Sequence, residues 1–172
     1  MNRGEFLTRF SIWIALIAYA VAASLLLQPR EPPRRRERAR WWWTLGCAFF
    51  LVHVLCAFAY FHHWSHSAAY RETARQTGQL TGWRWGGGIY FNYAFAAAWL
   101  ADVLWWWLAP RSFAQRPSWL NAIWQGFFFF MVFNGAIVFG HGPVRLLGVA
   151  ICLTLATLFS RQRKGLKFTE QH

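Results

Sequence analysis

Long apolar segments, separated by short clusters of arginine, are the feature that most constrains what this chain can fold into. Five segments qualify as membrane spans, because a span needs roughly 17 to 25 residues at 1.5 Å rise per residue. They are Phe6 to Leu27, Trp41 to His62, Gly88 to Ala109, Ser118 to Phe139 and Pro143 to Ser160. The pattern predicts an all-α, polytopic transmembrane helical bundle that forms a single membrane domain over residues 1–172.

The composition also places the chain in lipid. Hydrophobic residues make up 56% and aromatic residues 20% of the chain, which is more than a small soluble domain can bury. A net charge of +12 would suit nucleic-acid binding, but the basic residues flank apolar segments instead of forming a stripe along a polar helix. We therefore expect a bilayer with anionic headgroups as the partner, and no nucleic acid.

The basic residues also predict an orientation. With five spans, the Arg-rich loop 28–40, the connection 110–117 and the tail after residue 160 share one side and carry twelve of the eighteen Lys and Arg residues. The positive-inside rule places that side in the cytoplasm, with the N-terminus out and the C-terminus in. A cleavable signal peptide is the alternative for segment 6–27, but it would leave the arginines of the loop outside, so we prefer a retained first helix. Arginine-dominated clusters and compact loops favour a bacterial inner (plasma) membrane.

Six polar residues lie inside the apolar segments, where a side chain loses water and needs another partner. They are His53, Asn92, Asp102, Asn121, Gln125 and Asn134. The plain interpretation is hydrogen bonding between helices, with Asn92 and Asn134 paired near the outer face. At Gly126 and Gly135 we expect the backbones of neighbouring helices to approach closely.

Asp102 has two interpretations. Counted along an antiparallel helix pair, Asp102 and Gln125 lie at one depth, which favours a structural contact. A lone acid in a span also suits a proton or cation path. Asp102 is only about two turns from the cytoplasmic interface, within reach of Arg111 or Arg116.

A histidine-rich segment follows the second apolar stretch. Residues 62–77 contain no Gly or Pro, so we expect an extracytoplasmic helical segment over 62–78 that continues the second span. On such a helix His62 and His66 are one turn apart, and His141 is predicted on the same face of the membrane. The candidate ligands for a transition metal or haem are His62, His63, His66 and His141. We prefer the interpretation of interfacial histidines with ordinary hydrogen bonds, and a pH-responsive role is a third alternative.

Three functional hypotheses follow. No catalytic signature stands out, and five short helices bury little among themselves. The first hypothesis is therefore a noncatalytic accessory, structural or partner-binding subunit, assembled with other membrane subunits or as a homo-oligomer. The second is a metal- or haem-binding redox protein that uses the outer-face histidines, with His53 as a deeper candidate. The third is a transporter that uses Asp102.

Overall fold

The computed structural model describes residues 3–28 and 32–169, without the side chains of 161–169. The described residues form seven α-helices and one π-helical turn, and they contain no strand. The elements are α1 (Arg3–Leu26), α2 (Pro33–Tyr60), α3 (His66–Thr81), α4 (Gly88–Leu108), α5 (Pro110–Ala114), α6 (Ser118–Phe133), η1 (Asn134–Val138) and α7 (Pro143–Thr169). The predicted all-α fold is confirmed.

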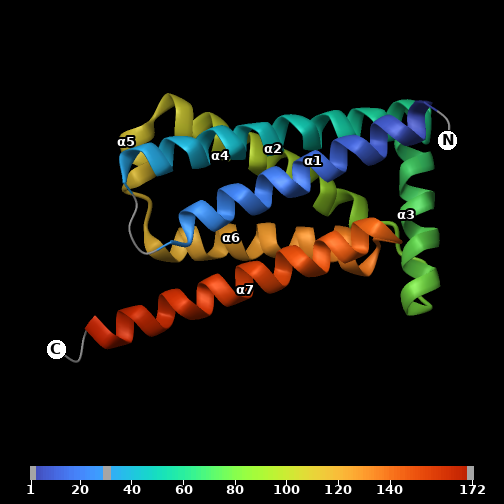
Figure 1. The fold of residues 1–172 in the computed structure, drawn as a ribbon. Coiled ribbons are helices and arrows are strands. Elements are labelled where there is room, and N and C mark those ends of the chain that lie inside the picture. The colour runs from blue at the N-terminus through green and yellow to red at the C-terminus, as the bar shows by residue number, and fades with distance from the viewer. Residues whose placement is uncertain (1–2, 29–31, 170–172) are drawn as a thin grey trace.

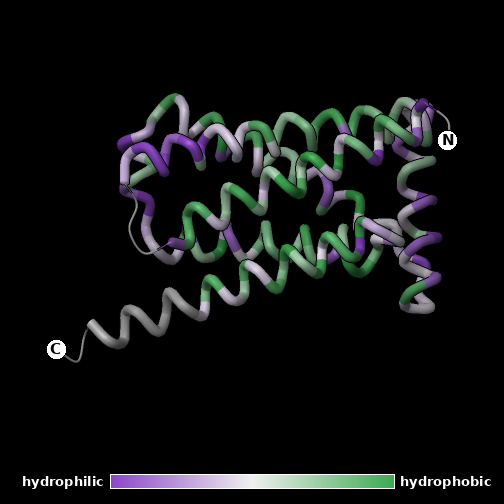
Figure 2. The backbone as a smooth tube through the Cα atoms, viewed as in Figure 1, coloured by the Kyte–Doolittle hydropathy of each residue, from purple (hydrophilic) through white to green (hydrophobic). Residues whose placement is uncertain are grey.

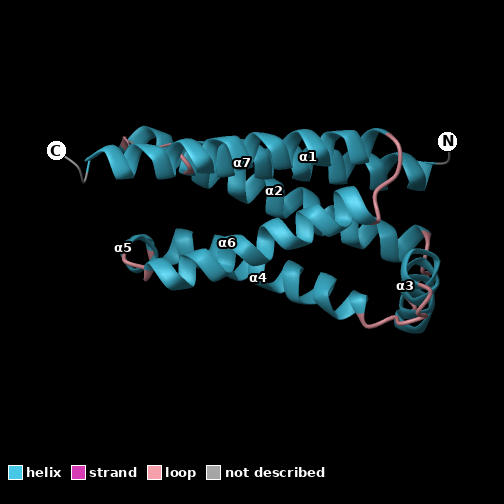
Figure 3. Ribbon diagram, turned by 90° about the horizontal axis from the view of Figure 1, so that it is seen from below, coloured by secondary structure: helices cyan, strands magenta, loops and turns pink. Residues whose placement is uncertain are grey.

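The long helices lie along one axis. Helices α1, α2, α4, α6 and α7 run side by side in alternating directions, α3 crosses one end of the bundle, and α5 lies at the opposite end (Figure 1). Seen from below, α1, α2 and α7 form one layer, and α4 and α6 form the other (Figure 3). We call the two ends of the bundle the α3 end and the α5 end. The chain starts at the α3 end and finishes at the α5 end.

Four helices are long and apolar enough to cross a membrane. They cover Arg3–Leu26, Pro33–Tyr60, Ser118–Val138 and Pro143–Ser160. Helix α4 is not among them, because its Trp, Tyr, Asn and Asp residues lower the hydropathy of an otherwise Ala-, Phe- and Leu-rich sequence. Hydrophobic residues follow the length of the bundle, whereas α3 is largely hydrophilic (Figure 2). Four apolar helices indicate an integral membrane protein.

Close helix packing is found at other glycines than the sequence suggested. A Cβ atom built on Gly4 would lie 2.5 Å from the Tyr60 ring, and one on Gly46 would lie 2.8 Å from the Trp99 ring. These two glycines therefore mark the close approaches of α1 to α2 and of α2 to α4. At Gly126 and Gly135 nothing lies within 4 Å of such an atom, so the expectation of close packing there is wrong. Helix α6 instead contacts its neighbours through large side chains such as Phe128.

The polar helix at the α3 end is separate from α2. The chain turns between Tyr60 and His66, where His63 and Trp64 take left-handed backbone angles with φ of 47° and 59°. Ser65 then caps α3 by accepting a hydrogen bond from the Ala68 N–H at 3.2 Å. Helix α3 ends at Thr81, and Gly82 caps it with a left-handed φ of 78°. The expected helix over 62–78 therefore exists, but it starts later, ends later and does not continue α2.

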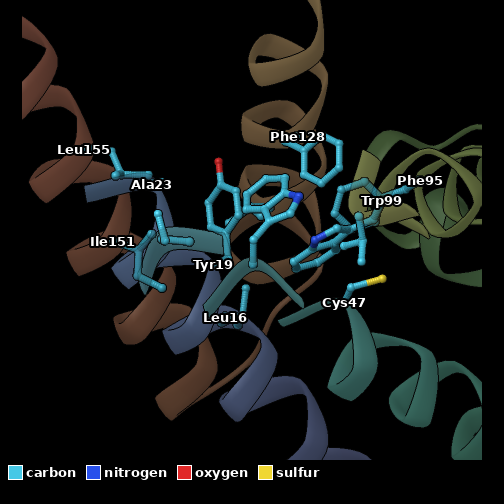
Figure 4. Close-up of a cluster of buried hydrophobic side chains, with 14 of the residues drawn as sticks. Leu16, Tyr19, Ala23, Cys47, Phe95, Trp99, Phe128, Ile151 and Leu155 are labelled. Carbon is cyan, nitrogen blue, oxygen red and sulfur yellow. The ribbon is translucent and has the colours of Figure 1, made fainter. Parts of the chain in front are cut away.

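An aromatic cluster fills the centre of the bundle between the two layers. It joins Tyr19 of α1, Trp43 of α2, Phe95 and Trp99 of α4, and Phe128 of α6 (Figure 4). Ring centroids lie 4.9 Å apart for Trp43 and Phe128, 5.3 Å for Phe95 and Trp99, and 5.4 Å for Trp99 and Phe128. These separations are typical of favourable aromatic pairs. The cluster holds both layers together and closes the inner end of the site described next.

Candidate functional site

A cavity of about 390 Å³ lies on the α3 side of the aromatic cluster, between the two helix layers. Tyr19, Phe50, Phe95 and Trp99 contribute to its lining and form what we call the cavity floor. Polar side chains line it as well, many of them near the α3 end. They are His53, His62, Glu72, Thr73, Gln76, Asn92 and Tyr93. The cavity thus has an aromatic floor and a polar end that meets α3.

His53, on α2, lies deeper in the bundle than His62, the other histidine that lines the cavity. Its Nδ1 is 2.9 Å from the backbone oxygen of Thr8 in α1. A carbonyl oxygen only accepts, so Nδ1 carries the proton and donates it. In a neutral imidazole the other nitrogen, Nε2, is then an acceptor. Within the described residues no hydrogen bond to Nε2 is present, and the His53 side chain lines the cavity.

A second hollow, which we call the α3 vestibule, adjoins the cavity. Four residues line both spaces: Ala57, His62, Glu72 and Gln76. In the vestibule Glu72 accepts hydrogen bonds from Arg75 Nε and from Gln76 Nε2, each at 2.9 Å. The hydrogen bonds from Arg75 hold the pKa of the Glu72 carboxyl below its usual value. The two hollows therefore meet at these four residues.

The histidines predicted as metal ligands do not form a compact group. His63, His66 and His141 are exposed, and only His62 lines the cavity. His66 begins α3, so it does not share a helix with His62, and its Nδ1 is 2.9 Å from the Tyr93 hydroxyl. Among the described residues no three His, Cys, Asp or Glu side chains are grouped to hold a metal ion. Metal binding at these histidines stays a prediction.

Asp102 is part of an ion pair at the α5 end. Its Oδ1 accepts a hydrogen bond from Arg116 Nη1 at 2.6 Å, and the two side chains are 2% and 5% exposed. Arg116 also donates from Nη2 to Asn121 Oδ1 at 3.0 Å. The guanidinium lies 4.5 Å from the centre of the Phe113 ring. We call Asp102, Arg116, Asn121 and Phe113 the Arg116 cluster. One of the two arginines expected near Asp102 thus pairs with it.

The predicted pairing of the amides between helices is not seen. Asn134 Nδ2 donates at 2.8 Å to the backbone oxygen of Phe130 in its own helix, so it does not pair with Asn92. Asn92 lines the cavity instead. Of the six intramembrane polar residues, the structure brings His53 and Asn92 to the cavity and brings Asp102 and Asn121 into the Arg116 cluster.

The sequence reasoning missed the α3 side of the cavity. The sequence analysis does not predict Glu72, Thr73 and Gln76 as site residues, although their spacing places them on one helix face. A polar stripe on a helix beside a membrane span was the available signal. Tyr19, Phe50 and Trp99 gave none, because an aromatic residue in a span has the same pattern whether it faces lipid or a cavity.

Comparison of the chain with protein-family models, with curated proteins and with solved structures finds no match. The cavity and its lining residues are therefore the basis for the proposed function.

Proposed function

We propose that the chain is a five-span protein of a bacterial inner membrane that noncatalytically binds a lipid-soluble small molecule in the cavity. The N-terminus and α3 face the outside, and the C-terminus faces the cytoplasm. The sequence predicted a noncatalytic subunit that binds other membrane subunits or itself, and the small-molecule ligand is proposed from the cavity. The observation that carries it is a cavity with an aromatic floor that adjoins a polar vestibule.

Helix α4 supplies the fifth span. Its 21 residues correspond to about 31 Å, the thickness of a hydrocarbon core. The chain has to return from the α3 end to the α5 end between α2 and α6, and α4 makes that crossing (Figure 1). Two of its polar residues have a place in the fold: Asn92 lines the cavity and Asp102 pairs with Arg116.

The orientation rests on charge. The start of α2 and the α5 region, which carry arginines, lie at the α5 end (Figure 1). Arg30 is outside the described residues, as are the side chains of Arg161, Arg163, Lys164 and Lys167. The positive-inside rule favours the cytoplasm for this end. Reporter tags at each terminus test it: we expect the C-terminal tag to be cytoplasmic and the N-terminal tag to be extracytoplasmic. A tail exposed outside overturns the orientation.

The shape of the cavity indicates the kind of ligand. Small-molecule sites are concave, mostly apolar, and have a few polar groups that fix orientation. Here the aromatic floor suits an apolar ring, and Glu72, Gln76 and His62 line the vestibule. A molecule with a polar head and an apolar body matches both regions. Because the cavity lies within the predicted membrane thickness, such a molecule has to be lipid-soluble.

Two glycines provide a matched test of binding. A side chain added at Gly135 or at Gly126 meets no atom within 4 Å of its Cβ, but only Gly135 lines the cavity. We expect Gly135→Phe to fill the cavity and Gly126→Phe to leave it open. Each variant is purified in mild detergent and its lipid extract is analysed by mass spectrometry. A small molecule present with the wild type and Gly126→Phe, but lost with Gly135→Phe, supports the proposal.

The contradicting outcome is equally clear. The cavity is not a binding site if none of the three lipid extracts contains such a molecule and added lipid-soluble probes bind the wild type and both variants equally.

The three hypotheses of assembly, metal or haem binding, and transport call for different measurements. Assembly with membrane subunits or as a homo-oligomer predicts a particle heavier than a monomer in mild detergent. Metal or haem binding predicts stoichiometric metal or a Soret band. For Asp102, the buried ion pair with Arg116 favours a structural role over transport.

A further inference from the structure

We propose that the cavity selects a hydroquinone-class ligand, meaning a flat ring that carries hydroxyl donors and an apolar tail, and that His53 Nε2 accepts one of those hydroxyls. The inference rests on the proposed binding function and names the ligand class of the same cavity. Three features carry it: the fixed proton of His53, the rings beside it and its depth in the bundle.

The hydrogen bond to Thr8 sets what His53 offers a ligand. Nδ1–H is committed to the Thr8 carbonyl oxygen at 2.9 Å, which leaves Nε2 as an acceptor. A ligand that fills the cavity displaces water from Nε2, and the acceptor then needs a donor from the ligand, because no described residue donates to it. A ligand that brings an O–H group supplies that donor. A ligand with only carbonyl or ether oxygens leaves Nε2 unpaired.

Aromatic rings surround the same part of the cavity. The Phe50 ring centroid lies 6.3 Å from the His53 ring, 4.9 Å from that of Phe95 and 5.7 Å from that of Trp99. All four side chains line the cavity. Aromatic surfaces favour flat aromatic rings through offset-stacked and edge-to-face contacts. A phenolic ring therefore fits beside His53 better than a flexible acyl chain does.

The depth of His53 excludes strongly hydrated ligands. His53 lies seven residues before the end of α2 at Tyr60, or about 10 Å along the helix. A sugar or a nucleotide would lose many water hydrogen bonds at that depth. The hydroquinone ring loses only those of its hydroxyls, and His53 replaces one of them. An apolar tail then keeps the molecule in the membrane.

The decisive comparison is between two probes with the same ring and tail. One is a decyl-substituted benzohydroquinone, and the other is its dimethyl ether, which cannot donate a hydrogen bond. Each is titrated into the purified wild-type protein in nanodiscs, with binding followed by isothermal titration calorimetry. We expect the hydroquinone to bind about tenfold more tightly, the factor typical of one hydrogen bond whose buried acceptor is otherwise unpaired.

A His53→Asn variant tests the residue itself. The asparagine amide nitrogen is the same number of bonds from Cα as Nδ1, so it can donate to Thr8, but nothing replaces Nε2. We expect the two probes to bind this variant equally. His141→Asn, at an exposed histidine outside the cavity, is the control and should keep the tenfold preference. Circular dichroism checks that each variant is folded, and the wild-type comparison does not depend on either.

The outcomes separate this inference from the proposed function. If both probes bind the wild type equally and Gly135→Phe blocks both, the hydroquinone assignment fails and the binding function stands. If neither probe binds and no bound molecule is extracted, both fail. A Soret band in the purified protein that His53→Asn removes assigns Nε2 to iron, and it also overturns the hydroquinone assignment.

Discussion

Polar side chains at the two ends of the bundle differ in how fully they are hydrogen-bonded. At the α5 end, Asp102 and Arg116 are almost fully buried, and Arg116 has both Asp102 and Asn121 as hydrogen-bond partners. At the α3 end, His53 uses one ring nitrogen to join α1 and α2 and leaves the other accessible in a cavity. A satisfied cluster can only stabilise the fold. An unpaired acceptor in a cavity is available to a ligand.

The membrane makes this contrast informative. Water does not reach the hydrocarbon core to compensate an unpaired polar group, so each one there is costly. At the α5 end Asp102, Arg116 and Asn121 are paired with one another, whereas Arg40 Nε, Trp43 Nε1 and Trp124 Nε1 are buried there without a partner among the described residues. At the α3 end, the proposed ligand would pair with the His53 nitrogen that has no partner among the described residues. If stability and binding are separated in this way, variants of the Arg116 cluster should lose stability, and variants beside the cavity should also lose binding.

Removing the acid of the Arg116 cluster should have the largest effect on stability. Asp102→Asn leaves the buried guanidinium without its charge partner, which typically costs about 3–5 kcal/mol. We expect a large decrease in the thermal midpoint of the purified protein, measured by circular dichroism in detergent.

The matched control removes both charges. An Asp102→Leu, Arg116→Met double variant leaves no buried charge unpaired and should recover most of the lost stability. An Asp102→Asn protein as stable as the wild type would show that the cluster is not structural, and the transport hypothesis would return.

The Arg116 cluster also shows how far the sequence could predict the fold. Helix-length apolar segments and arginine clusters predicted an all-α bundle, because both are read directly from residue type and spacing. The pairing of Asp102 with an arginine was also within reach, because Arg116 lies close along the chain. The choice of Arg116 over Arg111 depends on how α5 turns, which no local pattern specifies.

The cavity was harder to predict because it depends on contacts between distant segments. His53 was singled out as a polar residue in a span, but its bond to Thr8 joins residues 45 positions apart. Helix α3 was expected to continue α2. Ser65 and the left-handed residues His63 and Trp64 instead redirect it across the end of the bundle, where Glu72 meets the cavity.

A smaller effect is expected at the close approach of α2 to α4. The Cβ of a Gly46→Ala variant would lie 2.8 Å from the Trp99 ring, so the aromatic cluster has to shift. Overpacking of this kind costs roughly 1–3 kcal/mol. We expect a lower thermal midpoint, and weaker probe binding because Trp99 also belongs to the cavity floor.

Gly126→Ala is the control for that variant. Its Cβ meets no atom within 4 Å, and alanine is a better helix former than glycine, so the midpoint should stay the same or rise. Equal losses for Gly46→Ala and Gly126→Ala would mean that α2 and α4 do not approach closely at Gly46.

The smallest effect should come from the ion pair of the α3 vestibule, which is satisfied like the Arg116 cluster but exposed to water. The side chains of Arg75 and Glu72 are 51% and 36% exposed, and pairs of this kind add little stability. Because Arg75 lowers the pKa of Glu72 below its ordinary value of 4.5, the contribution is present above pH 4.5 and is lost as the pH falls through the lower, folded-state value. Thermal midpoints of the wild type and Glu72→Gln should therefore differ slightly at pH 7 and converge in acid. A Glu72→Gln loss as large as that of Asp102→Asn would show that burial does not decide which polar groups hold this bundle together.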